Sequence, residues 1–365
     1  MADQPRVKQR RMNQIQIAND VWLNIFPFLG SDQRIRKLSL ISCRFDGLVG
    51  IYFKKRTTWA LGDLEIRRSM DVLSAQFVNH RDERAPIPQG APPDGMIGFK
   101  RIDIRYIDHT VIDFLHRIQH LLINNAGQHI SVALEIASSE KLSWRVVSRH
   151  IWPLFASNIG TLRLVVDDPL GLCMLRKYMS PTVLRNSAAL QLLSVDTFFM
   201  HRFAPLGDRG GATESQAVSM WLHTPRADGR PKVFQFTTWF YNSQQMVDGL
   251  KEIFLSPSAA AANAATPAVA VSFIIVMRFR LFHKAVVEPV PFVLDNERTG
   301  ERLALRRVQD KMWLIERSPI GTDAKQWTEW TREALGEDTR DQPQQPQNSV
   351  INVHVADRVI GFVQP

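Results

Sequence analysis

Residues 17–49, IANDVWLNIFPFLGSDQRIRKLSLISCRFDGLV, carry more apolar side chains than so short a segment can bury by itself. Within residues 21–29, seven of nine side chains are apolar. A helix that lies on its own domain needs only one apolar stripe, with polar side chains elsewhere. We therefore expect a helix that is covered on most of its sides and that depends on a partner for stability.

The ends of this first helix can be predicted from its flanking residues. Asn19 or Asp20 is expected to cap the start, since a short polar side chain there accepts a hydrogen bond from a free backbone N–H. Gly30 is expected to end the helix in the left-handed conformation. Pro27 removes one backbone hydrogen bond inside the apolar run, so we expect a bend near it.

Two further helices are predicted, over residues 34–42 and 44–52, because apolar residues recur in both at helical spacing. The three-helix segment resembles the F-box, the module with which substrate receptors dock onto a Skp-family adaptor in Skp–cullin–F-box ubiquitin ligases. The residues that carry the resemblance are Ile17, Asp20, Val21, Leu23, Ile25, Phe26, Leu29 and residues 41–49. Ala18 stands where the family usually has proline, and residues 53–68 look like the nematode family of F-box proteins, with a weaker resemblance extending to about residue 320.

The resemblance implies a non-catalytic receptor that binds a Skp-family adaptor and, through it, a cullin, and that holds a target protein for ubiquitin transfer. Catalytic residues, metal ligands and cofactors are not expected. The residues expected to face the adaptor are Ile17, Val21, Leu23, Ile25, Phe26, Leu29, Leu38, Leu40 and Phe45.

Composition narrows the class of protein. The chain has 365 residues, two cysteines and 45% hydrophobic residues, which favours a globular fold without a disulfide framework. The sequence has no Asn-x-Ser/Thr sequon and no apolar N-terminal signal, so an intracellular location, in cytoplasm or nucleus, is expected. The longest apolar run, residues 268–277, is too short to cross a bilayer, so no membrane partner is expected. The net charge of +9 is scattered among acidic residues rather than gathered into a stripe, so nucleic acid is not the expected partner.

Five segments are predicted along the chain. Residues 1–14 are expected to form a disordered basic arm, 15–60 the F-box-like module and 61–98 a connecting linker rich in proline and glycine. Residues 99–320 are expected to form an α/β domain that recognises the target, and 321–365 a C-terminal tail. Within this tail, Trp327 and Trp330 fit a short helix, and the final VINVHVADRVIGFVQP fits either an added strand or a short partner-binding peptide.

Strand and helix patterns take turns from residue 100 onward, which favours a parallel sheet with helices packed on it. The first strands start roughly thirty residues apart, near positions 100, 129, 161 and 190. We interpret this region as an irregular, leucine-rich-repeat-like α/β array. A closed or doubly wound α/β domain is the alternative. Residues 291–320 predict an antiparallel meander at its end, so the fold class expected for the whole chain is α+β or α/β.

Target recognition is predicted on polar strand residues that face solvent. These are Arg101, Asp103, Arg105, Arg163, Gln235 and Thr237, which equally fit an ordinary solvated surface. Two other functions remain open from the sequence: an α/β enzyme with a helical N-terminal extension, and a basic nucleic-acid-binding protein. The enzyme hypothesis predicts a deep pocket in which polar groups with perturbed pKa values converge.

Overall fold

The structure is a computed structural model, and it describes residues 18–26, 37–55, 59–70, 74–79, 82–91, 96–123, 129–165, 170–196, 211–238, 243–256, 270–279, 288–336 and 349–363. Two compact units are present, Met1–Trp59 and Ala60–Pro365. Each is described by itself below.

The first unit contains helices α1 (Asn19–Ile25) and α3 (Cys43–Lys55). Its core is small: Phe26, Leu48 and Val49 are buried, and Trp22 and Phe45 meet edge to face with ring centroids 4.9 Å apart. Helix α3 covers the predicted helix 44–52.

The expected cap of α1 is wrong, because Ala18 occupies the N-cap position without a side-chain hydrogen bond. Asn19 instead accepts hydrogen bonds from the guanidinium of Arg44, with Oδ1 3.0 Å from Nε, so its side chain ties α1 to α3. Residues 1–17, which include the predicted basic arm, and residues 27–36, which include Pro27 and Gly30, lie outside the described residues.

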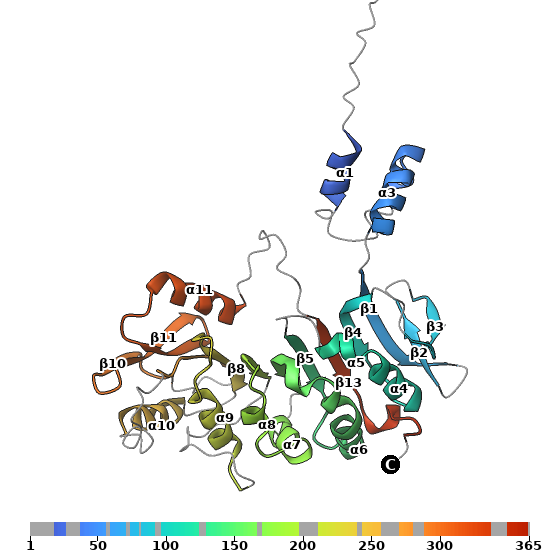
Figure 1. The fold of residues 1–365 in the computed structure, drawn as a ribbon. Helices are drawn as coiled ribbons and strands as arrows, with labels where there is room; N and C mark the ends of the chain where they lie inside the picture. Colours follow the sequence, from blue (N-terminus) through green and yellow to red (C-terminus); the bar gives the residue numbers. More distant parts are fainter. Residues whose placement is uncertain are drawn as a thin grey trace, which may run out of the picture. The chain divides into compact units, whose positions relative to one another are not determined.

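The second unit is built on one mixed sheet, which has thirteen strands among the described residues (Figure 1). The strands are β1 (Trp59–Arg68), β2 (Ala75–Val78), β3 (Arg84–Pro86), β4 (Met96–Ile104), β5 (Ile130–Glu135), β6 (Ile159–Leu164), β7 (Leu192–Val195), β8 (Lys232–Thr238), β9 (Phe273–Phe279), β10 (Phe292–Asn296), β11 (Glu301–Gln309), β12 (Met312–Pro319) and β13 (Val350–His354). Their order across the sheet is β10-β11-β12-β9-β8-β7-β6-β5-β13-β4-β1-β2-β3. The strands from β4 to β9 in this order are parallel, and β10–β12 form the predicted antiparallel meander.

Helices connect the parallel strands. They are α4 (His109–Arg117), α5 (Gln119–Ile123), α6 (Lys141–Val146), the π-turn η2 (Val147–Ile151), the 3₁₀ turns η3 (Trp152–Leu154) and η4 (Ala156–Asn158), α7 (Gly171–Tyr178), α8 (Val183–Asn186), α9 (Glu214–Leu222) and α10 (Ser243–Leu255). Figure 1 shows α6 to α10 along one side of the sheet and α11 (Ala324–Leu335) on the other. Strand residues alternate accordingly: in β8, Phe234 and Phe236 are buried while Val233, Gln235 and Thr237 are half-buried.

The alternation of strands and helices predicted from residue 100 to 279 is confirmed. Helix α10 spans Ser243–Leu255, and β9 begins inside the apolar run of residues 268–277. Pro181 lies between α7 and α8.

The predicted linker over residues 61–98 is wrong. This segment contains most of β1, all of β2 and β3, and the start of β4, which extend the sheet by antiparallel pairing of β1 with β2 and of β2 with β3. Asp108 anchors the extension, because its carboxylate accepts hydrogen bonds both from the backbone N–H of Ala75 (3.1 Å) and from that of Val111 at the start of α4 (3.1 Å).

Residues 321–365 do not form a separate tail, but the short helix and the added strand that fitted parts of this segment are both present, as α11 and β13. Helix α11 packs on β9, where Ala334 joins the buried Ile274, Val276 and Leu314. Beyond α11, β13 pairs in parallel with β4 on one side and with β5 on the other, so residues 350–354 lie inside the sheet. The turn η5 (Asp357–Val359) follows, and Asp357 caps α6 by accepting from the backbone N–H of Ser143 at 2.8 Å.

Candidate functional site

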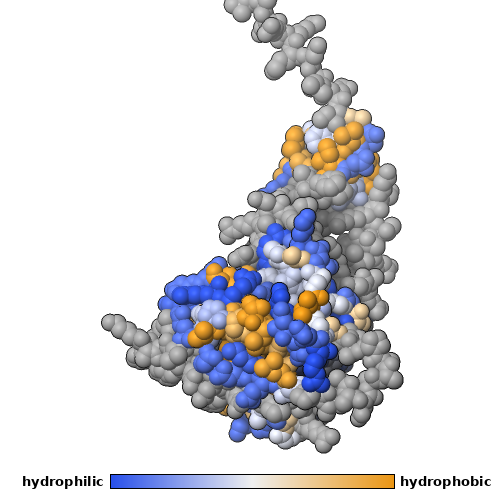
Figure 2. Space-filling view, turned by 90° about the vertical axis from the view of Figure 1, so that its left-hand side faces the viewer, coloured by the Kyte–Doolittle hydropathy of each residue, from blue (hydrophilic) through white to orange (hydrophobic). Residues whose placement is uncertain are grey.

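The first unit carries apolar side chains on its surface. Val21 is 43% exposed, Leu40 85%, Ile41 64% and Ile51 45%. Figure 2 shows apolar residues at the surface of this unit. Water contact of such side chains is unfavourable by about 25 cal/mol per Å² of apolar surface, so this surface gains stability when another apolar surface covers it.

The structure divides the predicted adaptor residues into three groups. Val21 and Leu40 are exposed, Leu23, Ile25, Leu38 and Phe45 are half-buried, and Phe26 is fully buried in the unit's own core. Ile17 and Leu29 lie outside the described residues.

The six predicted target residues lie on one face of the sheet of the second unit, the face opposite α6 to α10, here called the open face. Strand register aligns Asp103, Asn352, Ala133, Arg163, Ser194 and Gln235 in one row across six strands. Arg101 and Arg105 flank this row on the β4 side, and Thr237 stands opposite Arg278 of β9. Helix α11 covers part of this face, since Gln235 Nε2 donates to the carbonyl of Ala334 at 2.6 Å.

Strand β13 supplies polar residues to the open face that were not among the predicted site residues. Asn352 donates to the carboxylate of Asp103, and His354 Nδ1 lies 2.5 Å from Glu135 Oε2. The alternation in VINVHV, with Ile351 and Val353 buried and Asn352 and His354 half-buried, was a signal for this strand. Its place between β4 and β5 depends on contacts between distant segments, which no local pattern indicates.

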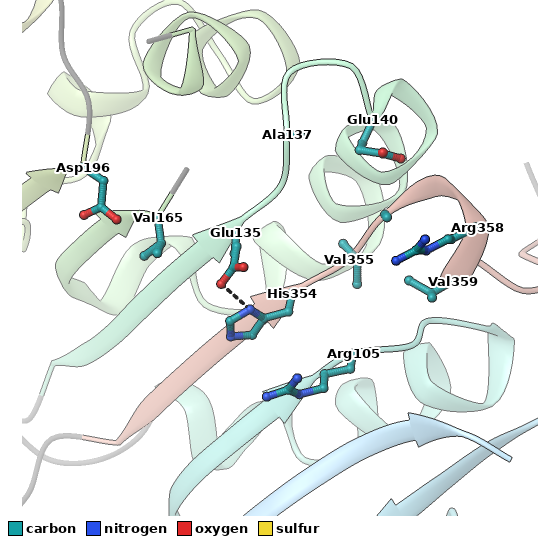
Figure 3. A pocket seen from close by; sticks show the side chains of 11 residues that line it. Arg105, Glu135, Ala137, Glu140, Val165, Asp196, His354, Val355, Arg358 and Val359 are labelled. Atoms are coloured by element: carbon teal, nitrogen blue, oxygen red, sulfur yellow. Dashed lines mark ion pairs between the residues drawn. The ribbon is translucent and has the colours of Figure 1, made fainter. Parts of the chain in front are cut away.

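A depression of about 630 Å³ lies at the carboxyl ends of β4, β13, β5 and β6 (Figure 3). Four of its charged groups are bound within the chain. Glu135 contacts His354, Arg105 Nε pairs with Glu65 Oε1 at 2.6 Å, and Glu140 Oε2 accepts from the backbone N–H of Asp357 at 2.5 Å. The depression thus presents a surface of mixed charge in which these four groups already have partners within the chain.

The groups with strongly shifted pKa values lie away from the pockets described here. Burial lowers the pKa of Lys232 to about 8, while its Nζ donates to the carbonyl of Trp221 at 2.6 Å and lies 5.2 Å from that ring. Burial, and secondarily the nearby Arg317, lower the pKa of His223 to about 4. Both residues belong to the packing around α9.

The lowered pKa of His223 predicts a pH-dependent stability. Between pH 6.5 and about pH 4 the unfolded chain binds a proton at this histidine and the folded chain does not, so stability falls as the pH falls through this window. We expect the free energy of unfolding to fall by about 2 kcal/mol across this window. This is less than the difference between the folded and unfolded pKa values of His223 would give, because its side chain is partly in contact with solvent.

Urea unfolding between pH 4 and 7 measures this loss, and His223→Phe removes the titrating group while keeping an aromatic ring against Phe273. The variant is expected to lose less stability than the wild type between pH 6.5 and 4. Parallel pH profiles for the two proteins would contradict the assignment.

Among the described residues, no group of three or more His, Cys, Asp and Glu side chains has the geometry to hold a metal ion. No helix in the described ranges combines the length and the apolarity that crossing a bilayer requires. Cys43 is exposed, and burial raises the pKa of Cys173.

No family model, no curated protein and no solved structure matches this chain. The resemblance of residues 17–49 to the F-box therefore stays a prediction.

Proposed function

We propose that this chain is the substrate-recognition subunit of a Skp–cullin–F-box ubiquitin ligase. The first unit binds a Skp-family adaptor, and the open face of the second unit holds a target protein. The chain performs no chemistry itself, and it acts by raising the local concentration of the target near the enzyme that transfers ubiquitin.

The observation that carries this proposal is the exposed apolar surface of the first unit. Four apolar side chains of the unit are each at least 43% exposed, namely Val21, Leu40, Ile41 and Ile51. The core of the unit contains only a few large side chains. A small helical unit of this kind buries too little surface to be stable alone and gains stability from a partner.

The architecture of the second unit supports a binding role. Strands β5 to β9 follow one another in sequence order, and α6 to α10 line one side, an arrangement that leucine-rich-repeat-like arrays share (Figure 1). The open face is polar and spans several strands, which suits a protein surface better than a small molecule. His223 and Lys232, whose pKa values burial lowers strongly, do not line the pocket on this face.

The test is quantitative binding of the purified full chain to a Skp-family adaptor. The double variant Val21→Asp/Leu40→Asp places two charges on side chains that are already exposed, so the fold is expected to persist. Adaptor binding is expected to weaken at least about thirtyfold, because charges are poorly tolerated in the apolar centre of an interface.

Asn24→Asp is the matched control, since it adds the same charge to an exposed position of α1. It is expected to bind the adaptor within about threefold of the wild type. Equal adaptor binding by the wild type and the folded double variant would refute the proposal.

A further inference from the structure

Two arginines of the open face converge on one pocket of about 410 Å³ beside the C-terminal end of α11. Arg163 lies on β6 and Arg278 on β9, three strands away, and both line this pocket together with Thr161, Ser194 and Thr237. We call it the arginine pocket.

The positive charge of this pocket is incompletely compensated among the described residues. Burial lowers the pKa of Arg278, and the nearby positive charge of Arg163 lowers it further. Within the described ranges, no ion pair joins the guanidinium of Arg163 or that of Arg278 to a carboxylate. Two carboxylates, Asp196 and Glu333, share the lining, and Glu333 is paired with Arg230. The C-terminal end of α11 adds a partial negative charge of about one half, which offsets only a fraction of the two full positive charges.

The hydroxyl groups complete a set of donors suited to an oxyanion. Thr161, Ser194 and Thr237 come from three neighbouring strands, and the register places Ser194 beside Arg163 and Thr237 beside Arg278. Guanidinium groups bind phosphate through paired, charge-assisted N–H···O bonds. Two guanidinium groups and several hydroxyl groups offer more hydrogen-bond donors than the two oxygens of one carboxylate can accept. A phosphoryl group has three or four acceptor oxygens and therefore matches this set of donors better.

We propose that the arginine pocket binds a phosphate-type oxyanion between Arg163 and Arg278. This deepens the proposed function, because a phosphoryl group on the target would then be one feature that the open face recognises. Binding of the free ion does not require the adaptor, so a failure here and a failure of adaptor binding are distinguishable.

Inorganic phosphate is the first probe, titrated into the full-length chain at constant ionic strength and followed by calorimetry and by the broadening of its ³¹P resonance. We expect one site per chain with a dissociation constant of about 1 mM or below. Arg163→Gln and Arg278→Gln are each expected to raise this constant about tenfold or more, since each removes charge-assisted hydrogen bonds. Arg101→Gln, on the same face but outside the pocket, is expected to leave it unchanged.

Phosphoserine is the second probe, and it distinguishes the source of the oxyanion. Tighter binding of phosphoserine than of phosphate indicates a phosphorylated segment of the target, and equal binding indicates the free ion. Arg163 is exposed, so its variant tests the site even if Arg278→Gln fails to fold. No phosphate binding by the wild type, or equal weakening by Arg101→Gln and Arg163→Gln, would overturn the proposal.

Discussion

Val353→Asp is expected to unfold the second unit, whereas Val350→Asp in the same strand is expected to be tolerated. Val353 is fully buried in β13 between Ile104 of β4 and Leu134 of β5. A carboxylate there has no partner, and the change also removes buried apolar surface, so we expect a loss of about 5 kcal/mol or more. That is comparable to the whole stability of many domains.

Val350 is the matched control for this experiment because it points to the opposite face of β13. It is half-buried and lies beside Arg101, which can compensate an added carboxylate. Urea unfolding followed by circular dichroism measures both variants, with an expected change below about 1 kcal/mol for Val350→Asp. Similar losses at the two positions would contradict the placement of β13 inside the sheet.

Glu301→Ala is expected to destabilise the second unit by about 3–5 kcal/mol, because it leaves a buried charge without its partner. The side chains of Glu301 and Arg317 are 4% and 10% exposed, and Arg317 Nη2 lies 2.5 Å from Glu301 Oε2. Glu301 Oε1 also accepts from the backbone N–H of Val271 at 2.7 Å. The alanine variant therefore loses both the ion pair and a backbone partner.

The double variant Glu301→Leu/Arg317→Met separates these contributions. It removes both charges and fills the space with apolar side chains. These can pack against the ring of Phe254, whose centre lies 5.2 Å from the guanidinium carbon of Arg317 in the wild type. Only the backbone N–H of Val271 is left unsatisfied, which costs about 1–3 kcal/mol. In thermal and urea unfolding the double variant is expected to be more stable than Glu301→Ala, and the reverse order would contradict the role of the unpaired charge.

Local sequence patterns predicted most of the second unit because its strands and helices have strong periodicity. The apolar run of residues 268–277, in which β9 begins, and the helical spacing of α10 each indicate their structure from local residues. The linker predicted over residues 61–98 is wrong because the glycine and proline residues at 86–98 are typical of loops, whereas the alternation in DLEIRR of β1 is short. Short strands such as β3 are stabilised by their neighbours in the sheet rather than by local preference.

The candidate sites were predictable to different degrees. Alternation identified Arg163, Gln235 and Thr237 as residues of a half-exposed face, because one-sided strands alternate visibly. It did not single out Arg278, which ends an apolar run that reads as buried throughout. The convergence of Arg278 with Arg163 depends on the strand order, and strand order follows from contacts between distant segments.

The position of β13 has a consequence for how the nascent chain folds. Asn352 and its partner Asp103 are 249 residues apart, so the ribosome completes β4 and β5 long before the strand that separates them. At roughly 5–20 residues per second the delay is about 10–50 s. During this time β4 and β5, joined by α4 and α5, are free to pair with each other as an ordinary βαβ unit does. Folding must avoid or reverse that pairing before β13 can insert between the two strands.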